Sequence, residues 1–352
     1  MQATKTLELY RVPKVLIISL KRFKASKSRY GFGGQKIDTL VDFPLEGLDM
    51  RPFVLMPEQR FNQQDIDHYR EHGYVLLQNF LSPEELLGVY ADVERLIPGW
   101  RYAVDPSRPK PDGWQEPPQS TLNPRFPFPG KALNQVTFHP ELRRFAATIA
   151  GHDDLVCEQS DLTYKCRNHN RDVDQNMHMD FGNHTLAYPS SEPKYWQTAY
   201  LIYYTDVTAD LAPTAVCSWQ HYKDELHWPA IHSRQQRPDL YEHEVLARVP
   251  AGSVLAYSTR TYHRGTKFLG DGGRVAHFIT YAPKNCAWLG IVGWPTQGVR
   301  GSYHRWIEQS SLAEREMIGF PPVGHDYWTD EMIQGVQARF PQLDMSPYKS
   351  RQ

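Results

Sequence analysis

The stretch Gln175-Asn176-Met177-His178-Met179-Asp180-Phe181 lies inside a region of short β-type runs that extends from residue 155 to residue 283. Turn residues separate these runs, which include 155–166, 196–205, 252–257 and 274–282. Many short strands at this spacing favour a mainly β domain, either a sandwich or a barrel.

His178 and Asp180 are two residues apart, and in an extended strand side chains at i and i+2 point to the same face. An imidazole and a carboxylate placed in this way can hold one metal ion together. The best candidate for a third ligand is His263, which ends the β-type run that follows the turn at 250–254. Two histidines and one carboxylate form the facial triad of non-haem Fe(II) oxygenases, which leaves coordination positions open.

Arg274 follows His263 by 11 residues, across a glycine-rich segment. We expect a hairpin here, in which the next strand returns beside the first and brings Arg274 into the same cavity as His263. A planar guanidinium in that place would bind a carboxylate in bidentate fashion.

Helical segments flank the β-rich region. Residues 61–72 are predicted to form a helix that Gly73 ends, and a strand is predicted over 74–80. Ser82, followed by Pro83 and two glutamates, is typical of a helix start, and that helix should end near Leu96. Further helices are predicted at 141–150 and within 301–340, and an irregular loop is predicted over 101–130.

Composition and charge exclude several classes of protein. Lys and Arg number 39 against 40 Asp and Glu, so the net charge of −1 gives no reason to expect nucleic acid or an anionic membrane as a partner. Four scattered cysteines do not form a disulfide framework. The apolar run at 15–20 is too short to span a bilayer or to act as a secretory signal, so a cytoplasmic location is expected.

The charge is unevenly distributed. Residues 1–50 carry a net charge of +4, whereas residues 51–352 carry −5. We therefore expect two unequal parts, a small segment at 1–50 and a large domain at 51–352. The glycine-rich stretch 25–35 is predicted to be a turn or a flexible loop.

His178-Met179-Asp180, His263 and Arg274, in this order and spacing, resemble the phytanoyl-CoA dioxygenase family of Fe(II)- and 2-oxoglutarate-dependent oxygenases. The resemblance covers residues 55–345, including 72–86 and 196–206. It implies a double-stranded β-helix, that is, a cupin-like jelly roll. Residues 206–214 depart from the pattern of many members, so a particular substrate such as phytanoyl-CoA does not transfer.

The same resemblance implies the chemistry. Fe(II) would be held by His178, Asp180 and His263, with 2-oxoglutarate as cosubstrate and O2 as oxidant. Arg274 would pair with the distal carboxylate of 2-oxoglutarate, and Lys165 and Trp196 match positions that line the cosubstrate pocket. A small organic substrate would be hydroxylated while 2-oxoglutarate is converted to succinate and CO2.

Residues 7–23 and 36–45 resemble an internal piece of a ubiquitin-specific protease. The catalytic Cys and His segments of that family are absent, and the first cysteine of the chain is Cys157. Peptidase activity and ubiquitin binding by residues 1–50 are therefore not expected. A genuine fusion that kept a remnant and a chimeric gene model both account for this segment.

Other interpretations remain open at this point. The large domain could be a non-catalytic jelly-roll binding protein, the N-terminal segment could be a ubiquitin-related module, and a zinc hydrolase is a weaker candidate. Of the remaining histidines, His184 is expected to be a hydrogen-bonded core residue and His277 a structural one.

Overall fold

The computed structural model describes residues 23–28, 31–36, 60–117, 124–167, 169, 172–185, 189–222, 227, 229–284, 286, 289, 294, 301–325, 328 and 330–349. The chain divides into two compact units, Met1–Gln59 and Arg60–Gln352. The expected boundary between residues 50 and 51 lies outside the described residues. Within the described residues, no helix combines the length and the apolar character that crossing a bilayer requires.

The described part of the smaller unit is a pair of antiparallel strands. β1 (Phe23–Ser28) pairs with β2 (Gly31–Lys36) in continuous register from Phe23↔Lys36 to Ser28↔Gly31. The prediction of a turn or flexible loop over 25–35 is wrong for these residues. Strand pairing rests on backbone hydrogen bonds, which polar and glycine residues can also make.

The described residues of the larger unit form two antiparallel sheets of five strands each. The first sheet consists, in spatial order, of β3 (Tyr74–Leu77), β10 (Val254–Ser258), β6 (Thr198–Tyr203), β12 (Gly273–Pro283) and β4 (Leu155–Cys166). The second sheet consists of β8 (Ile231–His232), β5 (Met177–His178), β11 (His263–Gly265), β7 (Thr214–Cys217) and β9 (Glu244–Leu246). The four long β-type runs predicted from the sequence all belong to the first sheet.

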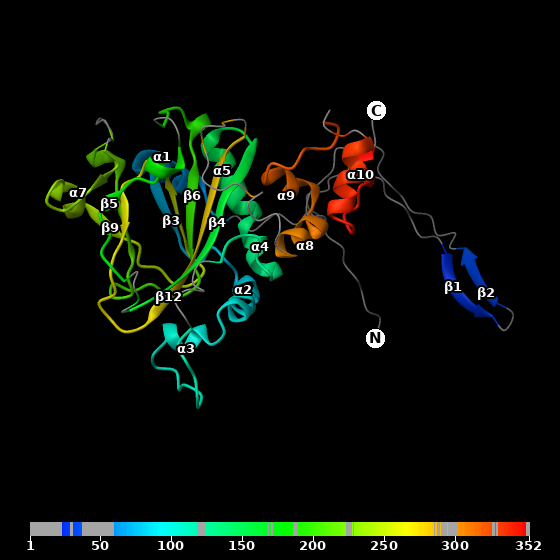
Figure 1. Ribbon diagram of the computed structural model, residues 1–352, viewed down its shortest axis with the longest axis horizontal. Helices are drawn as coiled ribbons and strands as arrows, with labels where there is room; N and C mark the ends of the chain where they lie inside the picture. The colour runs from blue at the N-terminus through cyan, green and yellow to red at the C-terminus, as the bar shows by residue number, and fades with distance from the viewer. Residues whose placement is uncertain are drawn as a thin grey trace. The chain divides into compact units, whose positions relative to one another are not determined.

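Helices precede, interrupt and follow the strands (Figure 1). They are α1 (Gln63–His72), α2 (Pro83–Leu96), α3 (Trp100–Val104), α4 (Lys131–Thr137), α5 (Pro140–Ala150), α6 (Phe181–His184), α7 (Pro238–Glu242), α8 (Gly301–Gln309), α9 (Leu312–Met317), α10 (Asp330–Arg339) and α11 (Ser346–Lys349). In the described part of the chain, the connections also contain the short 3-10 helices η3 (Pro193–Tyr195) and η4 (Trp219–His221).

The predicted helix ends are present. Ser82 caps α2 through a capping box with Glu85, so both residues satisfy backbone N–H groups that the first helical turn leaves free. Gly73 ends α1 in the left-handed conformation, with φ of 80°, where glycine carries no steric cost. The predicted irregular segment 101–130 begins instead within the short helix α3.

The two faces of the first sheet have different roles. One face packs against helices α1, α2, α4, α5, α8 and α9 in the largest apolar cluster, which includes Phe145, Leu162 and Ile279. The other face meets the second sheet through a smaller cluster that joins Leu201 and Leu255 to Val216 of β7. Two facing antiparallel sheets, with helices on the outside of one of them, confirm the predicted jelly roll.

Candidate active site

Two histidines face each other across the second sheet. His178 on β5 and His263 on β11 are direct partners in the antiparallel register, and their ring centroids lie 4.5 Å apart. Side chains of directly opposed residues project from the same face of a sheet. Strand pairing therefore places two imidazoles side by side, although the residues are far apart in the sequence.

Asp180 reaches the same point by a different route from the one predicted. It lies beyond the end of β5, in helical conformation (φ −69°, ψ −24°), and is the residue that precedes α6. Its Oδ1 atom is 3.8 Å from His178 Nε2 and 3.5 Å from His263 Nε2. The argument from a common strand face is thus wrong, because the turn into α6 brings the carboxylate to the histidines.

Backbone carbonyls set which nitrogen of each ring faces Asp180. His178 Nδ1 lies 2.8 Å from the carbonyl oxygen of Asn176, and His263 Nδ1 lies 3.0 Å from that of Thr261. A carbonyl only accepts, so each Nδ1 must carry the proton and each Nε2 keeps its lone pair. Both lone pairs are therefore available to a metal ion beside the Asp180 carboxylate.

The second carboxylate oxygen of Asp180 is held by Tyr257, whose hydroxyl donates to Oδ2 over 3.0 Å. Burial of Asp180 opposes ionisation, but His263, His184, His178 and this hydrogen bond outweigh it and lower the pKa of Asp180. Burial and the neighbouring His263 lower the pKa of His178. The lowered pKa of Asp180 favours a carboxylate and the lowered pKa of His178 favours a neutral imidazole, and these are the forms that bind a metal ion.

Arg274 enters the same cavity from the opposite sheet. β12 pairs with β4 and β6, whereas β11 pairs with β5 and β7, so the predicted hairpin between His263 and Arg274 does not form. The chain instead crosses from one sheet to the other between these residues. Arg274 is buried, its Nη1 lies 3.4 Å from Thr214 Oγ1, and it forms no ion pair with a described carboxylate.

Lys165 is the direct partner of Arg274 in the register of β4 and β12. Its Nζ donates to the carbonyl oxygen of Thr266 over 3.2 Å. Burial, together with the charge of Arg274, lowers the pKa of Lys165 to about 8. The buried Arg274 and the half-buried Lys165 at one end of the cavity favour an anionic ligand, because a buried charge needs a partner.

Trp196 lies elsewhere. It packs against the largest apolar cluster, its indole stands edge-on to Trp219, and its Nε1 donates to the carbonyl oxygen of Ser190. Among the described residues that line the cavity, Lys165 and Arg274 are present and Trp196 is not.

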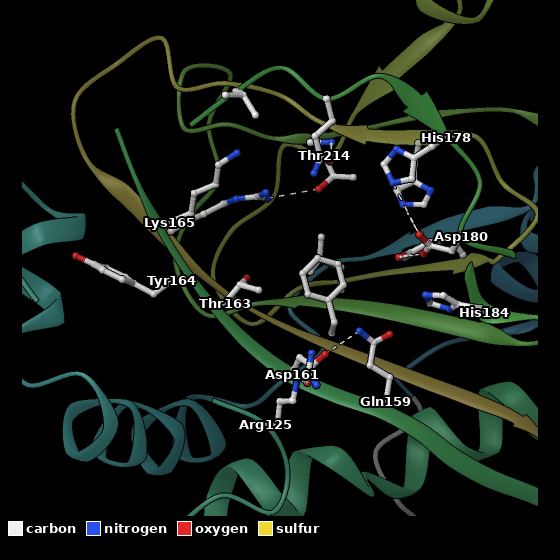
Figure 2. Close-up of a pocket in the computed structure, with 18 residues that line it drawn as sticks. Arg125, Gln159, Asp161, Thr163, Tyr164, Lys165, His178, Asp180, His184 and Thr214 are labelled. Atoms are coloured by element: carbon white, nitrogen blue, oxygen red, sulfur yellow. Dashed lines mark hydrogen bonds and ion pairs between the residues drawn. The ribbon is translucent and has the colours of Figure 1, made fainter. Parts of the chain in front are cut away.

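The cavity between the sheets has a volume of about 490 Å³ and contains the histidine pair, Asp180, Arg274 and Lys165. Figure 2 shows Lys165 and Thr214 at one end, His178 and Asp180 along one side, and Gln159, Asp161 and Arg125 at the other end.

Three polar side chains of β4 that line the cavity were not predicted from the sequence. Alternate residues of β4, namely Gln159, Asp161 and Thr163, all line the cavity, so their spacing was a usable signal. His184 also lines the cavity, and its buried Nδ1 has no hydrogen-bond partner, so it is not the hydrogen-bonded core residue expected. His277 is the structural residue expected, since both ring nitrogens bond to hydroxyl groups, of Ser160 and Tyr204.

A second cluster of possible metal ligands consists of Glu116, Cys166 and His169. Here His169 Nδ1 accepts the backbone N–H of Cys166, which places the ring proton on Nε2, 2.6 Å from Glu116. Burial raises the pKa of the Cys166 thiol to about 12. This hydrogen-bonded arrangement offers no free nitrogen lone pair, in contrast to the pair at His178 and His263.

The chain matches a known protein family across the residues of this site. The model of the phytanoyl-CoA dioxygenase family matches residues 69–276, which is more than half of the chain and includes both histidines and Asp180. The chain belongs to the phytanoyl-CoA dioxygenase family. The predicted family is confirmed, and with it the general class of a 2-oxoglutarate-dependent oxygenase.

Individual solved structures resemble this phytanoyl-CoA dioxygenase family member at low sequence identity. The carbocyclase SnoK from nogalamycin biosynthesis is 21% identical, with a TM-score of 0.47 over 64% of this chain and 85% of that one. HygX from Streptomyces hygroscopicus is 13% identical, with a TM-score of 0.46 over 64% of this chain and 88% of that one.

The N-terminal segment has relatives of another kind. Ubiquitin carboxyl-terminal hydrolase 15 of Homo sapiens is 54% identical over 56 residues, which are 16% of this chain. This chain spans only 5% of the length of that hydrolase. The predicted resemblance of the N-terminal segment to a ubiquitin-specific protease is confirmed as a short partial match.

Proposed function

We propose that this protein is an Fe(II)- and 2-oxoglutarate-dependent dioxygenase that hydroxylates a small organic substrate and converts 2-oxoglutarate to succinate and CO2. The observation that carries the proposal is the convergence of His178 Nε2, His263 Nε2 and Asp180 Oδ1, with each Nδ1 engaged by a backbone carbonyl. Two imidazoles and one carboxylate suit non-haem Fe(II) with open coordination positions.

The residues around these ligands would orient them. Tyr257 holds Asp180 Oδ2, which leaves Oδ1 to face the histidines. Asn176 and Thr261 fix the two rings through their carbonyl groups. When bound, the iron would supply the activation of O2, and the protein's part is to hold three ligands and keep the other positions open.

Arg274 would bind the distal carboxylate of 2-oxoglutarate. It is buried without an ion-pair partner among the described residues, and Thr214 orients its guanidinium. Lys165, which the family resemblance matches to the lining of the cosubstrate pocket, would add positive charge beside it. The position of Trp196 outside the cavity lining gives its predicted role in the cosubstrate pocket no support.

The test is an anaerobic titration of the protein with Fe(II) and 2-oxoglutarate, following the visible charge-transfer band of the ternary complex. The parent protein should develop the band, and His178→Ala should not. His221→Ala, which changes an exposed histidine outside the cavity lining, is the matched control and should behave as the parent. Absence of the band in the parent would refute the proposal.

The same titration distinguishes the role of Arg274 from that of the metal ligands. Arg274→Ala should still bind Fe(II) but require about 10- to 100-fold more 2-oxoglutarate to reach half of the band, because a charge-assisted bidentate pair is lost. An unchanged 2-oxoglutarate dependence would remove Arg274 from the cosubstrate site.

We also propose that residues 1–50 are a remnant without peptidase activity. The first cysteine of the chain, Cys157, is buried in the other unit, and burial raises its pKa well above the usual range, whereas a thiolate is the nucleophile that such a peptidase needs. A ubiquitin pull-down with the full chain should recover nothing above background, and specific recovery would contradict the proposal.

A further inference from the structure

The cavity has two ends of different chemical character, and this difference bears on the substrate. Lys165 and Arg274 form a cationic end, which the proposed function assigns to 2-oxoglutarate. Asp161 lies four residues before Lys165 on the same face of β4, which corresponds to about 13 Å along a strand. A five-carbon dicarboxylate held at Arg274 and at the metal ligands therefore leaves the end at Asp161 to another molecule.

This second end, which we call the polar pole, consists of Arg125, Gln159, Asp161 and His184. Asp161 Oδ2 accepts from Gln159 Nε2 over 3.0 Å, and Asp161 Oδ1 lies 3.3 Å from Arg125 Nε. Gln159 is fixed in turn, because its Oε1 accepts from the hydroxyl of Thr280 over 3.2 Å. The carboxylate thus has two partners, and its oxygens retain capacity for a further donor.

His184 supplies the observation that points to a ligand. It is 6% exposed, its buried Nδ1 has no hydrogen-bond partner among the described residues, and its ring lies in the cavity between Asp180 and Gln159 (Figure 2). A buried polar atom without a hydrogen bond costs free energy that a ligand can recover. The hydrogen bonds that orient the three metal ligands come from Asn176, Thr261 and Tyr257, and none of them involves this nitrogen.

The charges of the polar pole cancel. Arg125 and Asp161 form an ion pair in which the positive and the negative charge offset each other. An anionic group placed here would meet the Asp161 carboxylate, and a cationic group would meet Arg125. Fixed acceptors and donors without net charge suit hydroxyl groups, since each hydroxyl both donates and accepts.

We infer that the polar pole binds the substrate through neutral hydroxyl groups, so that the substrate is a polyhydroxylated, uncharged small molecule. The inference deepens the proposed function and rests on it for the assignment of the other end of the cavity. Asp161 would accept from one substrate hydroxyl, and His184 would pair with a second through Nδ1. His184 lies beside Asp180 in the cavity (Figure 2), so a molecule bound at the polar pole would extend toward the metal ligands.

The test uses two matched probes, methyl glucoside and methyl glucuronide, which differ by one carboxylate. Binding is measured by saturation-transfer NMR on the full chain loaded with Zn2+ and 2-oxoglutarate, so that the readout does not depend on turnover. The parent protein should bind the glucoside at least about threefold more tightly than the glucuronide. Equal or reversed preference, or no binding of the glucoside, would overturn the inference.

Variants at two positions examine the residues separately. Asp161→Asn leaves Arg125 without its counter-charge and should reverse the preference in favour of the glucuronide. His184→Phe should weaken glucoside binding by about tenfold, and His184→Gln should retain most of it. His221→Phe, at an exposed position outside the cavity lining, is the control and should change neither affinity. An unaltered preference in Asp161→Asn would also overturn the inference.

Failure of this inference can be distinguished from failure of the proposed function. A protein that forms the charge-transfer band with Fe(II) and 2-oxoglutarate but shows no preference for the glucoside keeps the proposed function and loses this inference. A protein without the band loses the proposed function, whatever the two probes show.

Discussion

At the scale of single residues, the site depends on where three protons sit. The carbonyl groups of Asn176 and Thr261 hold the protons of His178 and His263 on Nδ1. The hydroxyl proton of Tyr257 is directed at Asp180 Oδ2. Residues of this kind orient the ligands without contacting the metal, and their loss weakens metal binding while the fold remains.

Tyr257→Phe removes the proton that Asp180 Oδ2 accepts. We expect the affinity for Fe(II) or Zn2+ to fall by about 10- to 100-fold, because the carboxylate is no longer oriented by its partner. A competition titration against a chromophoric chelator measures this. Tyr303→Phe, at a buried tyrosine of α8 outside the cavity lining, should leave metal affinity unchanged. Equal affinity in the Tyr257 variant would show that the hydrogen bond does not support the site.

The metal-ligand candidates could be found from the sequence because their residue types and order are distinctive. The geometry could not, since Asp180 reaches His178 through the turn into α6 rather than along a strand. Tyr257 was missed because a tyrosine in a β-type run is usually a packing residue. His184 was misjudged because a hydrogen-bond partner cannot be inferred without the neighbours that the fold supplies.

At the scale of elements, β4 carries both the core and the cavity. Residues such as Leu162 face the helices, while the polar residues between them face the cavity. The alternation is broken at Glu158, where the register with β12 shifts. Glu158 is buried there, and its Oε2 accepts from Gln197 Nε2 over 2.8 Å.

Burial raises the pKa of Glu158 to about 7, against an opposing effect of the hydrogen bond from Gln197. The folded chain therefore holds this proton at pH values where the unfolded chain has lost it. The protonated Glu158 side chain therefore contributes its full share to the free energy of unfolding below the ordinary pKa of 4.5. This contribution is lost as the pH rises to about 7.

Glu158→Gln keeps the shape and the acceptor for Gln197 but cannot ionise. As the pH rises from 5 to 8, the unfolding free energy of the parent should fall relative to that of the variant by on the order of 2 kcal/mol. Denaturant unfolding at both pH values measures this. A constant difference between parent and variant across the interval would contradict the raised pKa.

Helices and long strands can be predicted from the sequence, because helix caps and the alternation of apolar and polar residues depend only on residues that are close in the sequence. Ser82 and Gly73 mark helix ends through their own hydrogen bonds and backbone conformation. The two- and three-residue strands of the second sheet leave no such pattern, because their pairing depends on partners far away in the sequence. The crossing of the chain between β11 and β12 was missed for the same reason.

At the scale of the whole molecule, the chain joins two units of very different size. Arg60–Gln352 contains the described apolar clusters and the cavity, and the family model lies entirely within it. The N-terminal segment matches a short piece, 5 to 6% of the length, of much longer ubiquitin carboxyl-terminal hydrolases. The chemistry argued for the cavity uses no residue of the smaller unit.

Deletion of residues 1–59 should therefore leave the charge-transfer band with Fe(II) and 2-oxoglutarate unchanged in both intensity and ligand dependence. The deletion should also leave the midpoint of thermal unfolding within a few degrees of the parent, since the core of the larger unit is intact. Loss of the band or of cooperative unfolding in the shortened chain would assign the N-terminal unit a structural role.

The direct pairing of His178 with His263 has a consequence for folding. β5 is two residues long and β11 three, so backbone pairing alone contributes little to holding them together. A metal ion bound to both rings would act as a cross-link that closes a long loop of chain, and such links stabilise by restricting the open ensemble. We expect the backbone amides of these two strands to exchange with deuterium faster in the metal-free protein, while those of β4 and β12 stay protected.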